Sequence, residues 1–362
     1  MPAMQIAANS ASPLAVVSLR VFPVREPVSH RSYTVVKLTT RSGISGYGEC
    51  GTASAADVAK ATAVVQGKPA TAVEVIRTQL APVANMQAAV NMALLDIVGK
   101  HTKAPIYRVL GGPTRNKARV LTALSGNSDE ALVEALKVSA ARGHRAFMVQ
   151  LQEGQAAHPN RVAKTFDKLR AAGGENVDFA LDGAAALSPG VAGTICDALE
   201  RFHLLWFDEP CPSLNIAALQ KLALERVTPL GFGRSIHSGV GFQNLLRDGA
   251  LDVLRPDIAR NGITQIRRMA AMAETYYTAV APYHDGGPIA SAAALQLAAS
   301  LPNFFIQQIP APQAEEDIRM RASITGASIE AVKDGYASLP TGPGLGITVN
   351  EEALAQYAER AA

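Results

Sequence analysis

The chain has 362 residues, of which 48% are hydrophobic and 18% charged, and its formal net charge at neutral pH is +3. This length allows a large buried core in one or two domains. The mild basic excess, without a cluster of lysines and arginines, argues against nucleic acid or an anionic membrane as the main partner. No apolar run approaches the length needed to cross a membrane.

The cysteines and the N-terminus bear on the compartment. Cys50, Cys196 and Cys211 are widely separated and odd in number, a pattern that favours a reducing compartment over a disulfide scaffold. Residues 1–13 lack the basic and apolar regions of a secretion signal, so we expect a disordered tail there. Together these features predict a cytoplasmic protein.

Residues 14–113 are predicted to form an α+β capping domain. Segments 14–24 and 33–40 are rich in β-forming residues, and a turn at 41–43 leads into a further extended segment, which indicates an antiparallel sheet. From Ala55 the composition becomes alanine-rich and helical. An apolar-periodic helix begins at Ala89 and is followed by a lysine-histidine stop and a pair of glycines.

Residues 114–335 alternate strand-like and helix-like segments at nearly constant spacing. The strands are predicted at 119–124, 145–151, 176–182, 204–208, 228–234, 251–257, 278–283 and 304–308. Eight such units predict a (β/α)8-type barrel. A doubly wound open sheet is the alternative, but no GxGxxG follows a first strand. Residues 336–362 are expected to return to the capping domain.

The strand ends carry polar residues that a barrel would gather on one face. Asp182, Asp208, Arg234 and Asp257 each stand at the carboxyl end of a predicted strand. In barrels of this kind the carboxyl ends of the strands form the face on which chemistry is placed. We therefore expect these side chains to converge on one pocket.

Several long motifs resemble the enolase superfamily, in its mandelate racemase/muconate lactonising branch. They are the helix AAVNMALLDIVGKHTKAPIYRVLGG, the strand ends FALDG, WFDEP and RPDIARNGIT, and the segment APYHDGGPIASAAALQLAASLPNF. The resemblance implies a barrel with an α+β cap. It also implies that a Mg2+ ion, held by carboxylates at the ends of strands three, four and five, binds a substrate carboxylate while a base removes the α-proton. Racemisation, cycloisomerisation or dehydration would follow.

The metal positions depart from this pattern. Asp182 matches the first ligand, Asp208 stands where the family usually has glutamate, and Arg234 replaces the third carboxylate. An arginine does not deprotonate to become a ligand, and a divalent cation prefers oxygen. Asp182 and Asp208 are thus remnant ligand positions. We expect no cofactor, with Mg2+ bound only if these two carboxylates suffice.

Arg234 offers a different way to balance the carboxylates. Three carboxylates with Mg2+ sum to a charge of −1, and so do Asp182, Asp208 and Arg234. We expect the guanidinium to lie near the vacated metal position and to fork onto the two aspartates. This arrangement is either a structural salt bridge, which we favour, or an anchor for a substrate carboxylate.

The positions at which the family carries its catalytic base also differ from the family pattern. The paired lysines of strand two are replaced by Met148 and Gln150, and a frequent glutamate on strand eight is Gln308. Gln150 and Gln308 join Arg234 as candidate substrate-binding residues.

The candidate catalytic residues are Tyr283, His284 and Asp257. Tyr283 takes the place of the strand-seven histidine, with His284 displaced by one, while the strand-six aspartate is kept as Asp257. Neighbouring residues on a strand point opposite ways, so His284 reaches the pocket only if the strand has ended or bulged there. Without a histidine partner, Asp257 is expected to contact a backbone amide, Arg255 or Arg260.

Three functions remain open on this evidence. The favoured one is a diverged family member that has lost metal-assisted proton abstraction and binds a small carboxylate, assembled as a homo-oligomer. The second is an active isomerase or dehydratase on a hydroxy-acid or acid-sugar carboxylate, with Arg234 in place of the metal. The third is a purely structural subunit.

Overall fold

The computed structural model describes residues 12–152, 154–155, 158–213, 215–237 and 239–358. Most of the tail predicted at 1–13 therefore lies outside the described residues. No helix in these ranges combines the length and the apolar character that crossing a bilayer requires.

The N-terminal capping domain is an antiparallel sheet covered by helices. Its strands pair in the order β1-β2-β3, and helix α3 packs against β3. Helix α3 is buried along most of its length because it touches the sheet on one side and helix α10 of the barrel on the other. The elements are β1 (Val16–Arg25), β2 (Ser32–Thr40), β3 (Ser45–Cys50), α1 (Ala55–Val65), α2 (Val73–Gln79), α3 (Ala84–His101) and α4 (Ile106–Val109).

Within the described residues, eight parallel strands form the barrel that the sequence predicts. They are β4 (Lys117–Ala123), β5 (Ala146–Gln150), β6 (Asp178–Asp182), β7 (Phe207–Asp208), β8 (Leu230–Phe232), β9 (Val253–Leu254), β10 (Ala279–Val280) and β11 (Gln307–Gln308). Neighbours pair in chain order from β4 to β10, and β11 pairs with β4. A parallel bridge from Val280 to Phe304 joins the remaining gap and closes the barrel.

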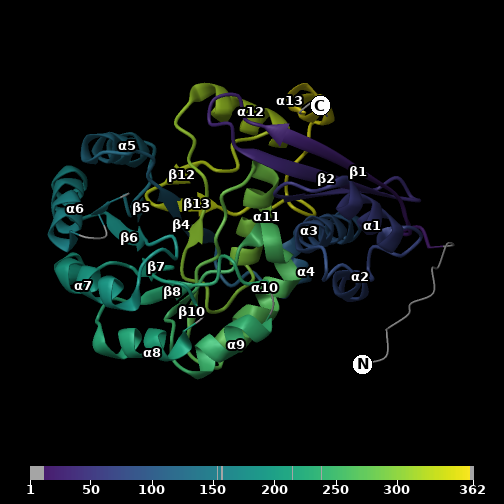
Figure 1. The fold of residues 1–362 in the computed structure, drawn as a ribbon. Helices are drawn as coiled ribbons and strands as arrows, with labels where there is room; N and C mark the ends of the chain where they lie inside the picture. Colours follow the sequence, from purple (N-terminus) through teal and green to yellow (C-terminus); the bar gives the residue numbers. More distant parts are fainter. Residues whose placement is uncertain (1–11, 153, 156–157, 214, 238, 359–362) are drawn as a thin grey trace.

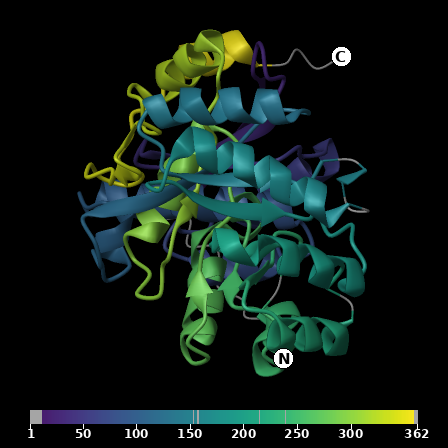
Figure 2. The same cartoon turned by 90° about the vertical axis from the view of Figure 1, so that its left-hand side faces the viewer.

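Helices cover the outside of the barrel, and α5 to α8 lie side by side in Figure 2. They begin and end as α5 (Asp129–Ala141), α6 (Pro159–Gly173), α7 (Pro189–Leu199), α8 (Ile216–Glu225), α9 (Gly239–Arg247), α10 (Ile258–Glu274), α11 (Pro288–Ala298) and α12 (Glu315–Thr325), with a 3-10 turn at Glu200–Phe202. Inside the barrel, apolar side chains such as Met148 and Trp206 form a separate small cluster. The interior is therefore packed, and ligands must approach from the strand ends.

The C-terminal segment contacts both domains (Figure 1). The hairpin β12 (Val332–Lys333) and β13 (Tyr336–Ser338) joins the barrel sheet, because β13 pairs antiparallel with β4. Helix α13 (Glu351–Tyr357) then packs on β1 of the cap. Glu351 bonds with Lys37 and with the Tyr47 hydroxyl, 2.7 Å away. The chain end thus lies against the cap.

Candidate functional site

The strand order brings the polar strand ends together at one face of the barrel. Asp182 and Asp208, the last residues of β6 and β7, are direct partners in the parallel ladder. Gln150, which ends β5, is in register with Asp182 on its other side. Arg234 follows β8 by two residues. Convergence of these tips is therefore a consequence of strand register.

Arg234 holds the position between the two aspartates. Its Nη1 and Nη2 donate to Asp182 Oδ2 and Oδ1 over 2.8 and 2.6 Å, and its Nε lies 3.4 Å from Asp208 Oδ2. The Glu209 carboxylate fixes the loop by accepting from the Gly233 and Arg234 backbone amides. Burial lowers the pKa of Arg234, but Asp208 and Asp182 outweigh it and hold that pKa above its usual range. The Arg234 guanidinium therefore stays positively charged at physiological pH.

A second arginine, Arg255, completes the ion network formed by Asp182, Asp208 and Arg234. The sequence reasoning did not identify it as a partner of Asp208. Arg255 is fully buried, and its Nε and Nη2 lie 3.0 and 3.4 Å from the two oxygens of Asp208. Its Nη1 donates to Ala281 O over 2.6 Å, and Trp206 Nε1 also donates to Asp208. Asp182, Asp208 and Arg234 sum to a charge of −1, and Arg255 brings these four side chains to zero.

This donor set does not fit a divalent metal. Both oxygens of Asp182 are bonded to Arg234, and both oxygens of Asp208 face Arg255. Within the part of the chain that the structure describes, no group of three or more histidines, cysteines, aspartates or glutamates could hold a metal ion. Mg2+ demands near-octahedral oxygen coordination, which a guanidinium in the same space opposes.

Asp257 and Tyr283 border a cavity of about 310 Å³ between the cap and the barrel. Asp257 Oδ1 caps helix α10 by accepting from Ala259 N over 2.8 Å, so a backbone amide is its partner rather than Arg255 or Arg260. Burial raises the pKa of the Asp257 carboxyl to about 7. Burial also raises the pKa of Tyr283 well above its usual range, so this phenol stays protonated. An acid–base group and a hydrogen-bond donor thus share one cavity wall.

His284 does not face this cavity, contrary to its selection as a catalytic candidate. It is fully buried, and its Nε2 lies 3.0 Å from Gly287 O and 3.1 Å from Ser291 Oγ. Burial lowers its pKa to about 3. The reason is local: Tyr283 bridges in register to Asp257 and lines the cavity, so the next side chain points to the opposite side, where it contacts the start of α11.

A second cavity, of about 530 Å³, lies at the ends of β4, β5 and β11. Gln150 and Gln308 line it together with Thr122, whose buried hydroxyl has no hydrogen-bond partner among the described residues. Gln308 Oε1 accepts from Arg255 and so belongs also to the ion network. Cys211, in contrast, is buried, and burial raises the pKa of its thiol to about 11, so no reactive thiolate is present there.

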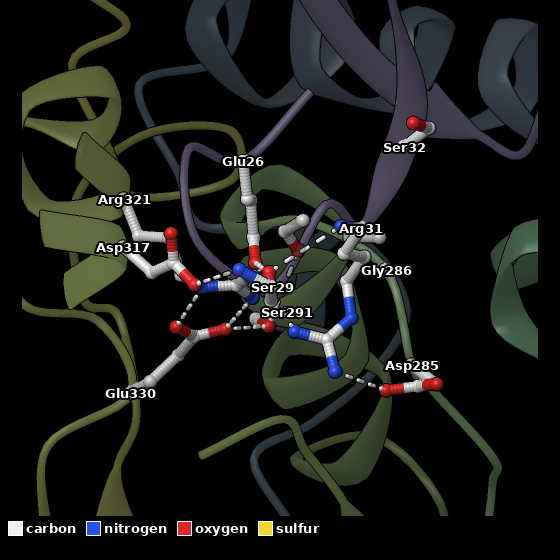
Figure 3. Close-up of polar contacts among 12 residues, drawn as sticks. Glu26, Ser29, Arg31, Ser32, Asp285, Gly286, Ser291, Asp317, Arg321 and Glu330 are labelled. Atoms are coloured by element: carbon white, nitrogen blue, oxygen red, sulfur yellow. Dashed lines mark hydrogen bonds and ion pairs between the residues drawn. The ribbon is translucent and has the colours of Figure 1, made fainter. Parts of the chain in front are cut away.

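The loop between β1 and β2, residues 26–31, lines the second cavity through Val28, Ser29 and Arg31 and is called the cap loop below. Figure 3 shows its contacts with Asp285 and Asp317. Arg31 lies 3.2 Å from Glu26 within the loop and 2.8 Å from Asp285 on the barrel. Asp285 lines both cavities. The Arg31–Asp285 ion pair therefore bridges cap and barrel between the two chambers.

Comparison with known families agrees with this architecture. Residues 15–111 match the mandelate racemase/muconate lactonizing enzyme N-terminal domain, and residues 130–353 match the enolase C-terminal domain-like family. The chain belongs to the mandelate racemase/muconate lactonizing enzyme branch of the enolase superfamily. Family members typically use Mg2+, whereas the donor set around Asp182 and Asp208 in this chain includes two arginines.

Relatives of the chain are named as lyases and isomerases. D-galactonate dehydratases from Ralstonia nicotianae and Pectobacterium atrosepticum are 29% and 27% identical over 73% and 76% of this chain, covering 71% and 74% of their own. A mandelate racemase/muconate lactonizing enzyme-like protein from Roseovarius sp. TM1035 superposes with a TM-score of 0.85 at 26% identity, covering 96% of both chains. These names lend no support to the loss of catalysis favoured above.

The structure of the 3,6-anhydro-D-galactonate cycloisomerase from Zobellia galactanivorans also matches. Its TM-score is 0.85 at 23% identity, and the match covers 96% of this chain and all of the other. At this identity the likeness concerns the fold alone.

Proposed function

We propose that this protein is a metal-independent lyase or isomerase that acts on an acid-sugar or hydroxy-acid carboxylate at the barrel mouth. The observation that carries the proposal is the Arg234 guanidinium, fixed between Asp182 and Asp208. We infer that this guanidinium supplies a permanent positive charge in place of the dication that the family uses. The substrate carboxylate would bind to this charge.

The Arg234 guanidinium has N–H donors left over for a substrate carboxylate. A guanidinium carries five N–H groups, and Asp182 takes one from each Nη. One N–H on each Nη is left without a partner among the described residues. When a base removes the α-proton, the electron pair of the C–H bond moves onto the carboxylate, and the doubled negative charge of the enediolate strengthens its bonds to Arg234.

Asp257 is the group best suited to accept the α-proton. Its Oδ1 is engaged by Ala259 N, which leaves Oδ2 toward the cavity that it lines. A base works best when its pKa lies near the operating pH, and that of Asp257 is about 7. Tyr283, protonated and on the same wall, would donate a hydrogen bond to the departing hydroxyl or to the enediolate.

Exchange of the α-proton with solvent deuterium tests this function. Protein treated with EDTA is incubated in D2O with a panel of acid sugars and hydroxy acids, and loss of the α-proton signal is followed by NMR. We expect exchange with at least one compound, unchanged by EDTA. Arg234→Met should reduce its rate by about 10² to 10³-fold, the usual effect of removing one charge-stabilising donor.

Arg201→Met, which removes an arginine from an exposed ion pair on the outside of the barrel, is the matched control and should keep the full rate. Exchange that requires Mg2+, or that survives in Arg234→Met, would contradict the proposed role of the guanidinium.

A second candidate is binding without turnover. Met148 is packed inside the barrel where the family carries a lysine base, and His284 is turned away from the mouth. A rise in melting temperature with an acid-sugar carboxylate, lost in Arg234→Met and unaccompanied by exchange, would favour this function.

A further inference from the structure

The strand order gives a carboxylate bound to Arg234 different neighbours on its two sides. β5 lies next to β6, on one side of the strand ends that carry Asp182, Asp208 and Arg234, whereas β9 and β10 follow β8 on the other side. The α-carbon of a substrate held by its carboxylate on Arg234 therefore presents one face toward β9 and β10 and the opposite face toward β5. The side chains at these two sides decide from which face a proton is removed and to which face it is returned.

The side formed by the ends of β9 and β10 carries groups that can transfer a proton. Asp257 and Tyr283 are direct partners in a parallel bridge, and both line the same cavity. The Cζ atom of Arg234 lies 5.3 Å from the centre of the Tyr283 ring, so a carboxylate bound to Arg234 borders this wall. Asp257 Oδ1 accepts from a backbone amide, and Oδ2 has no hydrogen-bond partner among the described residues. A pKa of about 7 suits Asp257 to both the uptake and the release of a proton near neutral pH.

The side formed by the end of β5 carries groups that bind rather than transfer protons. Gln150 presents a carboxamide, which is neither an acid nor a base near neutral pH, and Met148 is packed inside the barrel. Two carboxylates also line the cavity on this side, and both are engaged. Asp317 accepts two backbone amides of the cap loop, each over 2.9 Å, and Asp285 binds Arg31 over 2.8 Å. This side is therefore suited to hold substrate hydroxyls by hydrogen bonds.

A base on one face selects among the reactions that can follow proton removal. Racemisation needs a proton delivered to the face opposite the one that it left, because the enediolate is planar. Elimination needs only one face, since the group that took the α-proton can give it to a hydroxyl that leaves from the neighbouring carbon. Burial raises the pKa of the Tyr283 phenol well above its usual range. Protonated Asp257 is therefore the stronger acid on this wall.

We propose that Asp257 catalyses a syn elimination of water from a 2,3-dihydroxy carboxylate, acting first as the base and then as the acid on one face of the substrate. This inference rests on the proposed function and narrows it from a lyase or isomerase to a dehydratase. Asp257 takes the proton from C2, and the C–H electron pair moves into the enediolate held by Arg234. The pair then forms the C2–C3 double bond as the C3–O bond breaks. The departing hydroxyl takes the proton from Asp257 and leaves as water.

The product follows from this balance of atoms and electrons. The enol that remains takes up a proton at C3, loses the proton of its C2 hydroxyl and becomes a 2-oxo-3-deoxy acid. C2 is oxidised and C3 is reduced within one molecule, so the reaction needs no external oxidant or reductant. Tyr283 donates a hydrogen bond to the enediolate, through which both the proton exchange and the loss of water pass.

NMR in D2O tests the inference with two pairs of C2 epimers, D-galactonate with D-talonate and D-gluconate with D-mannonate. We expect one epimer of a pair to exchange its α-proton and to form the 2-oxo-3-deoxy acid, while the other epimer neither reacts nor accumulates. Asp257→Asn should lower both rates by about 10² to 10⁴-fold, the usual contribution of a general acid–base group. Asp248→Asn makes the same change in an ion pair at the end of α9 and should keep both rates.

Tyr283→Phe separates the roles of the two side chains on this wall. Because Asp257 supplies the proton to the departing hydroxyl, this change should slow exchange and dehydration by the same factor. Loss of dehydration with exchange retained would identify Tyr283 as the acid and overturn the assignment to Asp257. Rates that survive in Asp257→Asn would overturn it as well.

The same spectra distinguish failure of this inference from failure of the proposed function. Exchange accompanied by the C2 epimer, or exchange without the oxo acid, would overturn the one-faced elimination and leave the proposed function standing. No reaction of any of these four acids would also overturn the inference. Exchange with other members of the wider panel then shows whether the proposed function stands without it.

Discussion

Arg234 and Arg255 convert the strand ends of this barrel into a charge-balanced network. Each aspartate is bonded through both oxygens, and Arg255 and Asp208 are fully buried. Removing one partner of a buried ion pair leaves an uncompensated charge, at a cost of about 3–5 kcal/mol. Both arginines therefore stabilise the fold, and only Arg234, with 21% of its side chain exposed, can also meet a ligand.

Asp257→Asn should change the pH dependence of stability. The pKa of this carboxyl is about 7 in the folded protein and 3.8 as a free side chain, so the folded state binds the proton more tightly. Tighter proton binding by the Asp257 carboxyl therefore stabilises the folded protein, fully below pH 4, and this stabilisation is lost as the pH rises through 7. Asparagine does not ionise and caps helices equally well. We expect Asp257→Asn to be more stable than the parent by about 2 kcal/mol at pH 8.

Urea unfolding at pH 4, 6 and 8 measures this difference. Glu49, whose pKa burial also raises to about 7, is present in both proteins and cancels in the comparison. The same offset between the two proteins at pH 4 and pH 8 would contradict a raised pKa at Asp257.

At the level of single residues, the sequence predicts the contact of Arg234 with Asp182 and Asp208 but not the second arginine on Asp208. Asp182, Asp208 and Arg234 follow from strand ends and spacing, and their convergence follows from register. The pairing of Arg255 with Asp208 depends on which way a two-residue strand turns its side chains. His284 shows the same limit, because one residue of offset moves a side chain from the cavity to the interior.

At the level of elements, the kinked start of helix α10 shapes the connection that follows β9. The structure shows that Asp257 caps a helical turn, which Gly262 then interrupts with φ +66° and ψ −179°. Thr264 N, just beyond, donates to Asn91 Oδ1 of α3 over 3.1 Å. The kink therefore joins the cap to the strand end that carries Asp257.

Gly262→Ala should destabilise the protein strongly. Its backbone conformation is one that is essentially restricted to glycine, and an added Cβ would lie 2.9 Å from Asn91 Oδ1. We expect a loss of about 3 kcal/mol in the free energy of unfolding. Gly249→Ala is the matched control, because Gly249 has φ +60° with nothing within 4 Å of the added Cβ. There the loss should be about 1 kcal/mol.

Chemical denaturation of both variants provides the measurement. Equal losses would mean that backbone strain alone acts at Gly262 and that the contact with Asn91 has no part in joining cap to barrel.

At the level of the whole molecule, repetition made the architecture predictable. Each unit repeats a mostly buried strand followed by a helix, and errors in a single boundary do not disturb the count of eight. The predicted strand at 251–257, for example, shortens to Val253–Leu254 without changing its place. The contacts of the cap loop with α12 could not be predicted, because they join residues such as Val28 and Asp317 across 289 positions.

The claim on which the functional account depends is that a guanidinium occupies the metal position. A crystal structure of the protein grown with millimolar Mg2+ and an acid-sugar carboxylate tests it most directly. We predict Arg234 on Asp182, the ligand carboxylate against its free N–H groups, and no ion between Asp182 and Asp208. An octahedral ion bound by these aspartates, with Arg234 turned out to solvent, would contradict the account.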